Sequence, residues 1–284
     1  MRILFYTLVS LLAFAGNSVL CRIALGEETI DAASFTSIRL LAGIIFLAVL
    51  LKLTSGVDSS SSKGSWSASL MLFIYAVAFS FAYVSLETGT GALILFGFVQ
   101  MTMIAIGLYK GNRLHALEWF GVLLAFSGLV GLGAPSLEGF TLMAVAGIDW
   151  GIYTLAGKGS TSPINDMAYN FYRTLPFVFV LTLVTFQQAE LSDKGILLAI
   201  LSGALASGLG YAIWYMALKG LSGTQAAVVQ LFVPVIAAIG GVVFADEAFS
   251  LRLALSALLI LGGILAVVLG RHALNQRDCS NQKS

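Results

Sequence analysis

Residues 251–270 read LRLALSALLILGGILAVVLG, a run of twenty residues in which Arg252 is the single charged side chain. A helix needs about 20 mostly apolar residues to cross the roughly 30 Å hydrocarbon core of a membrane. The run therefore predicts a membrane-spanning helix. Nine more apolar stretches of the same character precede it. They run approximately over residues 3–25, 34–53, 66–86, 92–109, 117–133, 140–157, 167–186, 196–218 and 226–244.

The composition of the whole chain agrees with ten such crossings. Of its 284 residues, 58% are hydrophobic and only 10% are charged. That is too little charge to cover a soluble globule of this size, so lipid must be the main solvent of the surface. Ten spans account for roughly 200 residues, which leaves no room for a separate soluble domain. The expected fold class is an all-α integral membrane protein with ten transmembrane helices.

Charge and cysteine content exclude several other classes of protein. The 15 basic and 14 acidic residues give a net charge of +1 without a dense basic cluster, so nucleic acid is not an expected partner. Cys21 and Cys279 lack the paired spacing of a metal site, and no disulfide is expected between them. The chain also has no Walker-type glycine loop. We therefore expect no metal, no cofactor and no coupling to ATP hydrolysis within this chain.

The positions of lysine and arginine predict the orientation in the membrane. With a cytoplasmic N-terminus, the outer connections carry only Lys194 and Arg252, while Arg22, Arg39 and Arg173 lie within or at the ends of spans. The inner connections then carry Arg2, Lys52, Lys63, Lys110, Arg113, Lys158, Lys219, Arg271, Arg277 and Lys283. The first apolar run is longer than a signal-peptide core and is expected to be retained. The prediction is a multi-pass protein of a bacterial cytoplasmic (inner) membrane with both termini cytoplasmic.

The two halves of the chain align with each other. Tyr83-Val84-Ser85-Leu86 aligns with Tyr215-Met216-Ala217-Leu218 at a shift of 132 residues. Similar shifts set Gly91 over Gly223, Ser127-Gly128 over Gly262-Gly263, and Arg39 over Arg173. Each half has five spans, an odd number, so the second half must cross the membrane in the opposite sense. We expect two inverted five-helix repeats, residues 1–134 and 135–270, followed by a polar cytoplasmic tail, 271–284, and a substrate site between the repeats.

Several residues of the second half carry a resemblance to a known family. They are Tyr215, Leu218, Ala226, Pro234, Glu247 and Gly262-Gly263. In their order and in the layout of two times five spans, the chain resembles the EamA-type permeases of the drug/metabolite transporter superfamily. The first half departs from the pattern, with Thr102 set against Pro234 and Asn112 set roughly against Glu247. The resemblance implies a transporter with a central cavity lined by the first, third, fourth, sixth, eighth and ninth spans, and it names no cargo.

The most informative single residue is Asp149, which lies about nine positions into the sixth predicted span. At about 1.5 Å per residue it is ~13 Å deep, close to the midplane. A carboxylate at that depth is costly, so it should face a cavity, pair with a cation or take up a proton. A desolvated Asp149 is a candidate for proton coupling. If Arg173 on the next span pairs with it, the role is structural or substrate-orienting.

Seven other side chains are candidates for substrate contact: Asn17, Tyr83, Gln100, Tyr153, Tyr211, Trp214 and Gln230. Tyr153 follows Asp149 by one helical turn, and Tyr211 and Trp214 share one stripe of the eighth span. Each candidate has a plainer alternative. Buried amides also pin helices together, and tyrosine and tryptophan also form belts at the membrane interface.

Other polar or helix-breaking residues within the spans favour structural roles. Arg39 lies shallow enough in the second span for its side chain to reach water. Arg22 is expected to anchor the first span or to pair with an acid, Glu27 or Glu28. Pro176 and Pro234 each remove one backbone hydrogen bond and are hinge candidates. Static kinks are the alternative for both prolines.

Together these features predict a secondary transporter and not an enzyme. The expected solute is a small polar or amphipathic metabolite, with export of amino acids or related compounds, driven by their own gradient or by protons, as the leading hypothesis. The alternative within transport is a nucleotide-sugar or phosphate exchanger. The alternatives outside it are a passive channel and a membrane-embedded enzyme. The expected partners are the solute, the lipid bilayer and a coupling proton, and the chain could act as a monomer or homodimer.

Overall fold

The computed structural model describes residues 2–54, 62–111, 114–132, 136–157, 160–221 and 223–281. Within these ranges the chain is helical, with no strand beyond an isolated bridge between Ile30 and Leu191. The helices are α1 (Arg2–Gly26), α2 (Ala32–Thr54), α3 (Trp66–Ser85), α4 (Thr88–Tyr109), α5 (Ala116–Leu132), α6 (Leu137–Gly157), α7 (Pro163–Tyr172), α8 (Leu175–Thr185), η1 (Phe186–Gln188), α9 (Asp193–Leu201), η2 (Ser202–Leu209), α10 (Gly210–Leu218), α11 (Gly223–Gln230), α12 (Phe232–Phe244) and α13 (Leu251–Asn281).

These helices form the ten predicted spans. There are more helices than spans because three of the spans are interrupted. The seventh is α7 with α8, the eighth is α9, η2 and α10, and the ninth is α11 with α12. Among the described residues, eight helical stretches are long and apolar enough to cross a membrane, and the shorter helices Ala116–Leu132 and Val228–Phe244 complete the ten. The predicted class, an all-α multi-pass membrane protein, is confirmed. The boundaries differ in places: α4 begins at Thr88, earlier than predicted, and α13 continues past Gly270.

Two of the interruptions coincide with the prolines predicted to break their spans. The seventh span breaks between α7 and α8, and the ninth between α11 and α12. An uninterrupted helix would need the N–H of Pro176 to donate to Tyr172 and that of Pro234 to donate to Gln230, and proline has no N–H. The break therefore lies one turn before each proline. Hinge motion at these points stays a prediction.

Short polar residues start several helices as their spacing predicts. Asp31 accepts hydrogen bonds from the backbone N–H groups two and three residues on, at 3.0 and 2.9 Å. Ser65 before α3 and Ser192 before α9 each accept one from the N–H three residues on, at 3.1 Å. These bonds satisfy N–H groups that a helix start leaves without a partner.

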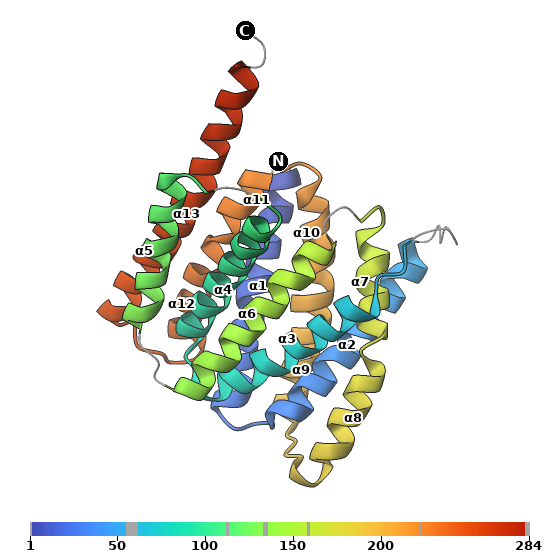
Figure 1. The fold of residues 1–284 in the computed structure, drawn as a ribbon. Coiled ribbons are helices and arrows are strands. Elements are labelled where there is room, and N and C mark those ends of the chain that lie inside the picture. The colour runs from blue at the N-terminus through green and yellow to red at the C-terminus, as the bar shows by residue number, and fades with distance from the viewer. Residues whose placement is uncertain are drawn as a thin grey trace.

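Spans of each half pack on spans of the other half (Figure 1). The third and fourth spans, α3 and α4, pack on α6, the first span of the second half. Reciprocally, α10 and α12 pack on α1. Other contacts join equivalent spans: α2 with α7 and α8, α4 with α12, and α5 with α13. The helix α2 also packs on α9 and η2 of the eighth span. Such reciprocity is what two inverted five-helix repeats produce.

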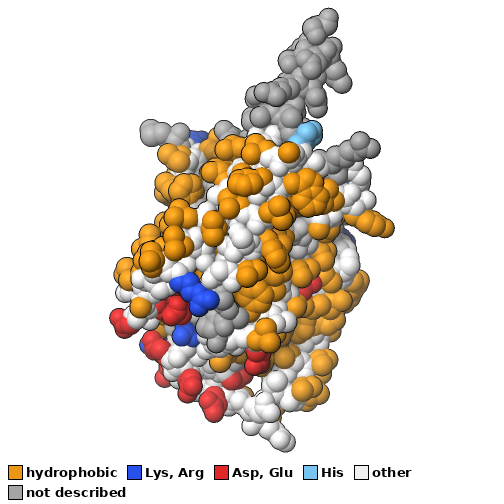
Figure 2. Space-filling model, turned by 60° about the vertical axis from the view of Figure 1, so that its left-hand side comes forward, with side chains coloured by type: hydrophobic (Ala, Val, Ile, Leu, Met, Phe, Trp, Pro, Cys, Tyr) orange, Lys and Arg blue, Asp and Glu red, His pale blue; other side chains and the backbone are white. Residues whose placement is uncertain are grey.

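The bundle has two chemically different ends. Both chain termini lie at the same end in Figure 1, which we call the termini end. Acidic side chains gather at the opposite end in Figure 2, which we call the acidic end, and hydrophobic side chains cover much of the surface between. The connections at the acidic end contain Glu27, Glu28, Asp31, Glu190, Asp246 and Glu247, and Asp193 begins α9 there. The termini end is the predicted cytoplasmic side, and that orientation stays a prediction.

A few predicted features fall outside what the structure describes. Asn112, the position set against Glu247, and the cations Arg113, Lys158 and Lys283 lie outside the described residues. The backbone of the polar tail is described as far as Asn281, where it continues the helix α13.

Candidate functional site

Four aromatic side chains from both halves of the chain contact one another. Trp150 of α6 stacks on Tyr153, with ring centroids 5.3 Å apart, and on Tyr211 of α10, at 5.0 Å. Its ring also lies 4.7 Å from that of Tyr75 on α3. We call Tyr75, Trp150, Tyr153 and Tyr211 the central aromatic cluster. Because α3 belongs to the first half of the chain and α6 and α10 to the second, the cluster lies where the two halves meet.

A stripe of rings along α3 extends this cluster. Phe79 lies 5.4 Å from Tyr75 and 4.8 Å from Tyr83, measured between ring centroids. All three side chains are buried. Of the three, only Tyr83 is among the candidates predicted from sequence. The spacing of four residues, which places side chains on one helical face, is a signal that could have indicated the other two.

A second extension joins the cluster to α1. Phe14 lies 5.5 Å from Tyr211 and 5.8 Å from Trp214. The structure thus links the predicted aromatic candidates of the eighth span to one another through a ring of the first half. Trp214 is buried, unlike a ring exposed to the membrane interface, although it lies only one turn before the end of α10.

Asp149 directly precedes Trp150 in α6 and is 8% exposed. Its carboxylate takes part in none of the ion pairs formed by the described residues. The predicted pair with Arg173 is therefore not formed. The reason is topological: α6 packs on α3 and α4, whereas Arg173 ends α7, which packs on α2 and α3.

Arg173 lies at the termini end and not beside the cluster. Its guanidinium donates to the carbonyl oxygen of Lys63 and lies 5.7 Å from the ring centroid of Trp66. Both partners precede or begin α3. Arg173 thus holds the start of α3 against the end of α7, a structural contact.

The predicted amides have different surroundings. Asn17 of α1 accepts a 2.6 Å hydrogen bond from the hydroxyl of Ser202, and both residues are buried, so this amide joins α1 to η2. Gln100 is buried in α4, and Gln230 is half-buried at the end of α11. Neither glutamine belongs to the central aromatic cluster.

A pocket of about 200 Å³ lies at the termini end, where α6 ends and α7 begins. Asp166 is held on its wall by the N–H of Gly64 at 2.6 Å and the hydroxyl of Ser160 at 2.5 Å. The wall also includes Tyr153, a member of the central aromatic cluster. The remaining lining residues are Ser62, Ser65, Ala68, Ala156, Gly157, Pro163, Met167, Asn170 and Tyr215. The pocket therefore extends from the termini end to the edge of the cluster.

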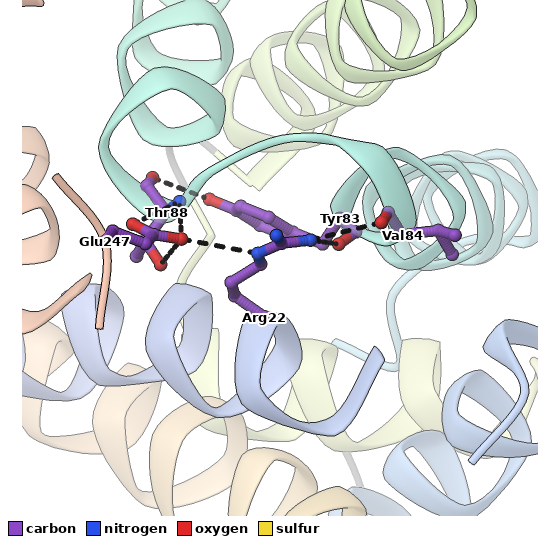
Figure 3. Close-up of polar contacts among 5 residues, drawn as sticks. All are labelled: Arg22, Tyr83, Val84, Thr88 and Glu247. Carbon is purple, nitrogen blue, oxygen red and sulfur yellow. Dashed lines mark hydrogen bonds and ion pairs between the residues drawn. The ribbon is translucent and has the colours of Figure 1, made fainter. Parts of the chain in front are cut away.

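A polar network closes the opposite end (Figure 3). The carboxylate of Glu247 accepts two hydrogen bonds from the backbone N–H of Thr88, at 2.8 and 2.9 Å, and one from its hydroxyl at 3.0 Å. Arg22 Nε lies 3.3 Å from the same carboxylate, and Arg22 Nη1 donates to the carbonyls of Tyr83 and Val84 at 3.0 and 3.1 Å. We call these five residues the acidic-end network.

The acidic-end network explains two differences from the sequence prediction. Arg22 pairs with Glu247, and not with either predicted acid; Glu27 pairs instead with Lys194. Glu247 also provides the acceptors that a helix N-terminus requires, which favours the early start of α4. Gly241 has no side chain where Glu247 packs, so the carboxylate can lie against the backbone of α12.

Arg39 is another polar residue for which the sequence interpretation is wrong. Its side chain does not reach water: it is 2% exposed. The guanidinium carbon lies 5.5 Å from the ring centroid of Tyr75 and 4.9 Å from that of Phe79. Depth along α2 suggests access to water, but α3 and η2 cover this face of the helix.

Comparison with known proteins agrees with the family resemblance that the sequence carries. The model of the EamA-like transporter family matches residues 137–269. An uncharacterized protein of Pseudomonas aeruginosa, PA1977, is 49% identical over 280 residues, which is 96% of this chain and 97% of that protein. An uncharacterized transporter of Bacillus subtilis, YoaV, is 25% identical over 151 residues, 51% of this chain and 52% of that protein.

A solved structure shares the fold. It is described only as "Crystal structure of protein", and it superposes with a TM-score of 0.62 at 16% sequence identity, covering 92% of this chain and 98% of that one. At this identity the likeness concerns the fold alone.

Proposed function

Because the chain belongs to the EamA-like transporter family, within the drug/metabolite transporter superfamily, we propose that it moves small polar or amphipathic metabolites by alternating access. In such a mechanism a site between inverted repeats is reached from one side of the membrane at a time. The observation that carries the proposal is the central aromatic cluster, which both halves build and which the pocket at the termini end approaches.

The contrast between the two ends supports alternating access. The pocket at the termini end reaches Tyr153. At the acidic end, Arg22 and Glu247 tie α1, the end of α3, the start of α4 and the connection before α13 together. A state with one end hollow and the other bonded is one of the two states that the mechanism requires.

The solute is proposed to be an amino acid or a related compound, moved outward. Aromatic rings offer faces for an apolar or cationic part of such a solute. Asn17, Tyr83, Gln100, Tyr153, Tyr211, Trp214 and Gln230 stay the proposed contact residues, with Asn17 also serving as a bond between helices. Asp149 stays the proposed proton-coupling group, because a buried carboxylate without an ion-pair partner can gain and lose a proton at low cost to the fold.

Transport into proteoliposomes tests this function. A panel of labelled amino acids and related metabolites would be measured with and without a pH gradient for the wild type and Asp149→Asn. We expect transport of at least one amino acid by the wild type, stimulated by the gradient, and loss of that stimulation in the variant.

The matched control is Asp246→Asn, which makes the same chemical change outside the helices, at the acidic end. Its backbone φ of 51° is one that asparagine also adopts, so the fold should tolerate it. Unchanged rate and pH dependence in Asp149→Asn would show that the proton-coupling assignment is wrong. Failure of every solute in the panel to move would contradict the proposed substrate class.

A further inference from the structure

We propose that Arg39, together with Ser207, binds a carboxylate group of the transported solute. This inference rests on the proposed transport function and names the chemical class of substrate for the same central site. It assigns a role to a cation that neither the predicted site nor the acidic-end network uses.

The guanidinium of Arg39 is buried and incompletely satisfied. Nη2 is 3.4 Å from the hydroxyl oxygen of Tyr75, a long hydrogen bond. Nη1 has no hydrogen-bond partner among the described residues. None of the described acids forms an ion pair with it either. An arginine has five N–H donors and keeps its charge, so most of its donor capacity is unused here.

An unpaired cation inside a membrane bundle is costly, and such residues generally mark a functional site. The rings of Tyr75 and Phe79 offset part of the charge through their faces. They leave the edge of the guanidinium, where the N–H groups point, without an acceptor at Nη1. What the site lacks is an anionic acceptor.

A second unpartnered polar atom belongs to the helix that packs against α2. The hydroxyl of Ser207 in η2 has no hydrogen-bond partner among the described residues, and the side chain is 2% exposed. It and Arg39 Nη1 are the two unpartnered buried side-chain atoms found in the described part of the chain. Both therefore belong to the pair of packed helices α2 and η2.

Two glycines of the π-helix η2 allow it to lie close to α2. A Cβ added to Gly203 would collide with the carbonyl oxygen of Arg39, and one added to Gly208 would lie 2.7 Å from Phe46 of the same helix α2. Ser207 lies between these two glycines in sequence, and Tyr211 of the central aromatic cluster follows it by four residues. π-helical turns often occur at functional sites.

The chemistry of these groups favours a carboxylate. A guanidinium edge and a hydroxyl can all donate, and a carboxylate has two planar oxygens that accept from them. Tyr75 links the arginine to the central aromatic cluster, since it contacts both Arg39 and Trp150. A solute with a carboxylate at Arg39 would therefore have its other end among aromatic rings.

The test compares carboxylate solutes with their methyl esters, which add one methyl group and lose the negative charge. In proteoliposomes, each amino acid that the wild type transports would be competed by unlabelled free acid and by unlabelled methyl ester. We expect the wild type to prefer the acid by roughly 10- to 100-fold, the value of one or two charged hydrogen bonds. Arg39→Gln should reduce this preference to near one while ester transport persists.

Two further variants separate binding from folding. Arg39→Lys keeps the charge and loses the paired donor edge, so we expect an intermediate preference. Arg173→Gln changes the arginine aligned with Arg39 in the other repeat and should keep the wild-type preference. If Arg39→Gln does not fold, the lysine variant and the wild-type preference for acid over ester carry the test.

The possible failures are distinguishable. A wild type that transports none of the panel contradicts the substrate class in the proposed function, on which this inference rests. A wild type that transports amino acids but does not prefer acid over ester overturns the inference about Arg39 alone. A folded Arg39→Gln protein that retains the full preference overturns it as well.

Discussion

Arg22 and Arg39 carry the same side chain on successive helices and have opposite surroundings. Arg22 has a carboxylate and two carbonyl oxygens as partners. Arg39 is more deeply buried and has one long hydrogen bond and two ring faces. A paired arginine at a helix end contributes to stability, whereas an unpaired one in the interior opposes it. The difference indicates that Arg22 stabilises the fold, whereas Arg39 has unused donors that can bind a ligand.

From this comparison we expect the largest loss of stability when Glu247, the partner of Arg22, is substituted. Glu247→Ala removes the acceptor of three hydrogen bonds and leaves Arg22 without its counter-ion, so we expect a loss of about 3 kcal/mol in the free energy of unfolding. Thermal unfolding in detergent would measure it as a drop in midpoint of several degrees.

The matched control for this variant is Glu87→Ala. Glu87 is the residue before α4 and makes no capping hydrogen bond with its side chain. Its removal should change the midpoint little. Equal effects of the two substitutions would contradict the assigned role of Glu247.

The next largest effect concerns the close approach beneath Arg39. In Gly203→Ala, the added methyl group would meet the carbonyl oxygen of Arg39 and push η2 from α2. We expect a loss of about 2 kcal/mol, as for other overpacked interiors. Gly16→Ala is the control, because a Cβ there has nothing within 4 Å. A lower midpoint for the control than for Gly203→Ala would refute the close contact.

In contrast to these substitutions, Arg39→Met is predicted to raise the free energy of unfolding. Methionine has a similar length, fills apolar space and removes the unpaired charge. We expect a gain of about 1 kcal/mol in stability, part of the benefit being lost with the ring contacts, together with loss of acid transport. A fall in unfolding midpoint comparable to that of Glu247→Ala would mean that the Arg39 charge supports the fold.

The smallest effect is expected at Arg173, the residue aligned with Arg39 in the second repeat. Its guanidinium donates to the carbonyl of Lys63 and contacts one ring, that of Trp66. Arg173→Met should lower stability by less than about 1 kcal/mol and leave transport within about twofold. Loss of transport in a well-folded Arg173→Met protein would restore Arg173 as a site residue.

The candidate site is partly predictable from sequence. Asp149, Tyr153, Tyr211 and Trp214 stand out because polar or amphipathic residues in mid-span need a reason to be there, and the structure buries all four. Trp150 escapes prediction because a tryptophan in an apolar run has no distinctive pattern. Its role follows from the stacking partners that α3 and α10 supply.

The sequence by itself determined the ten spans, because a lipid environment requires long apolar segments that satisfy their own backbone hydrogen bonds. It also determined the family, through the second half and its order of motifs. Only the tertiary structure decided which charges are paired. Glu247 pairs with Arg22, although most of the sequence lies between them. Arg173, at the end of α7, does not pair with Asp149. Whether a buried charge has a partner depends on a few ångströms between side chains from separate helices, which hydropathy and periodicity along one chain do not contain.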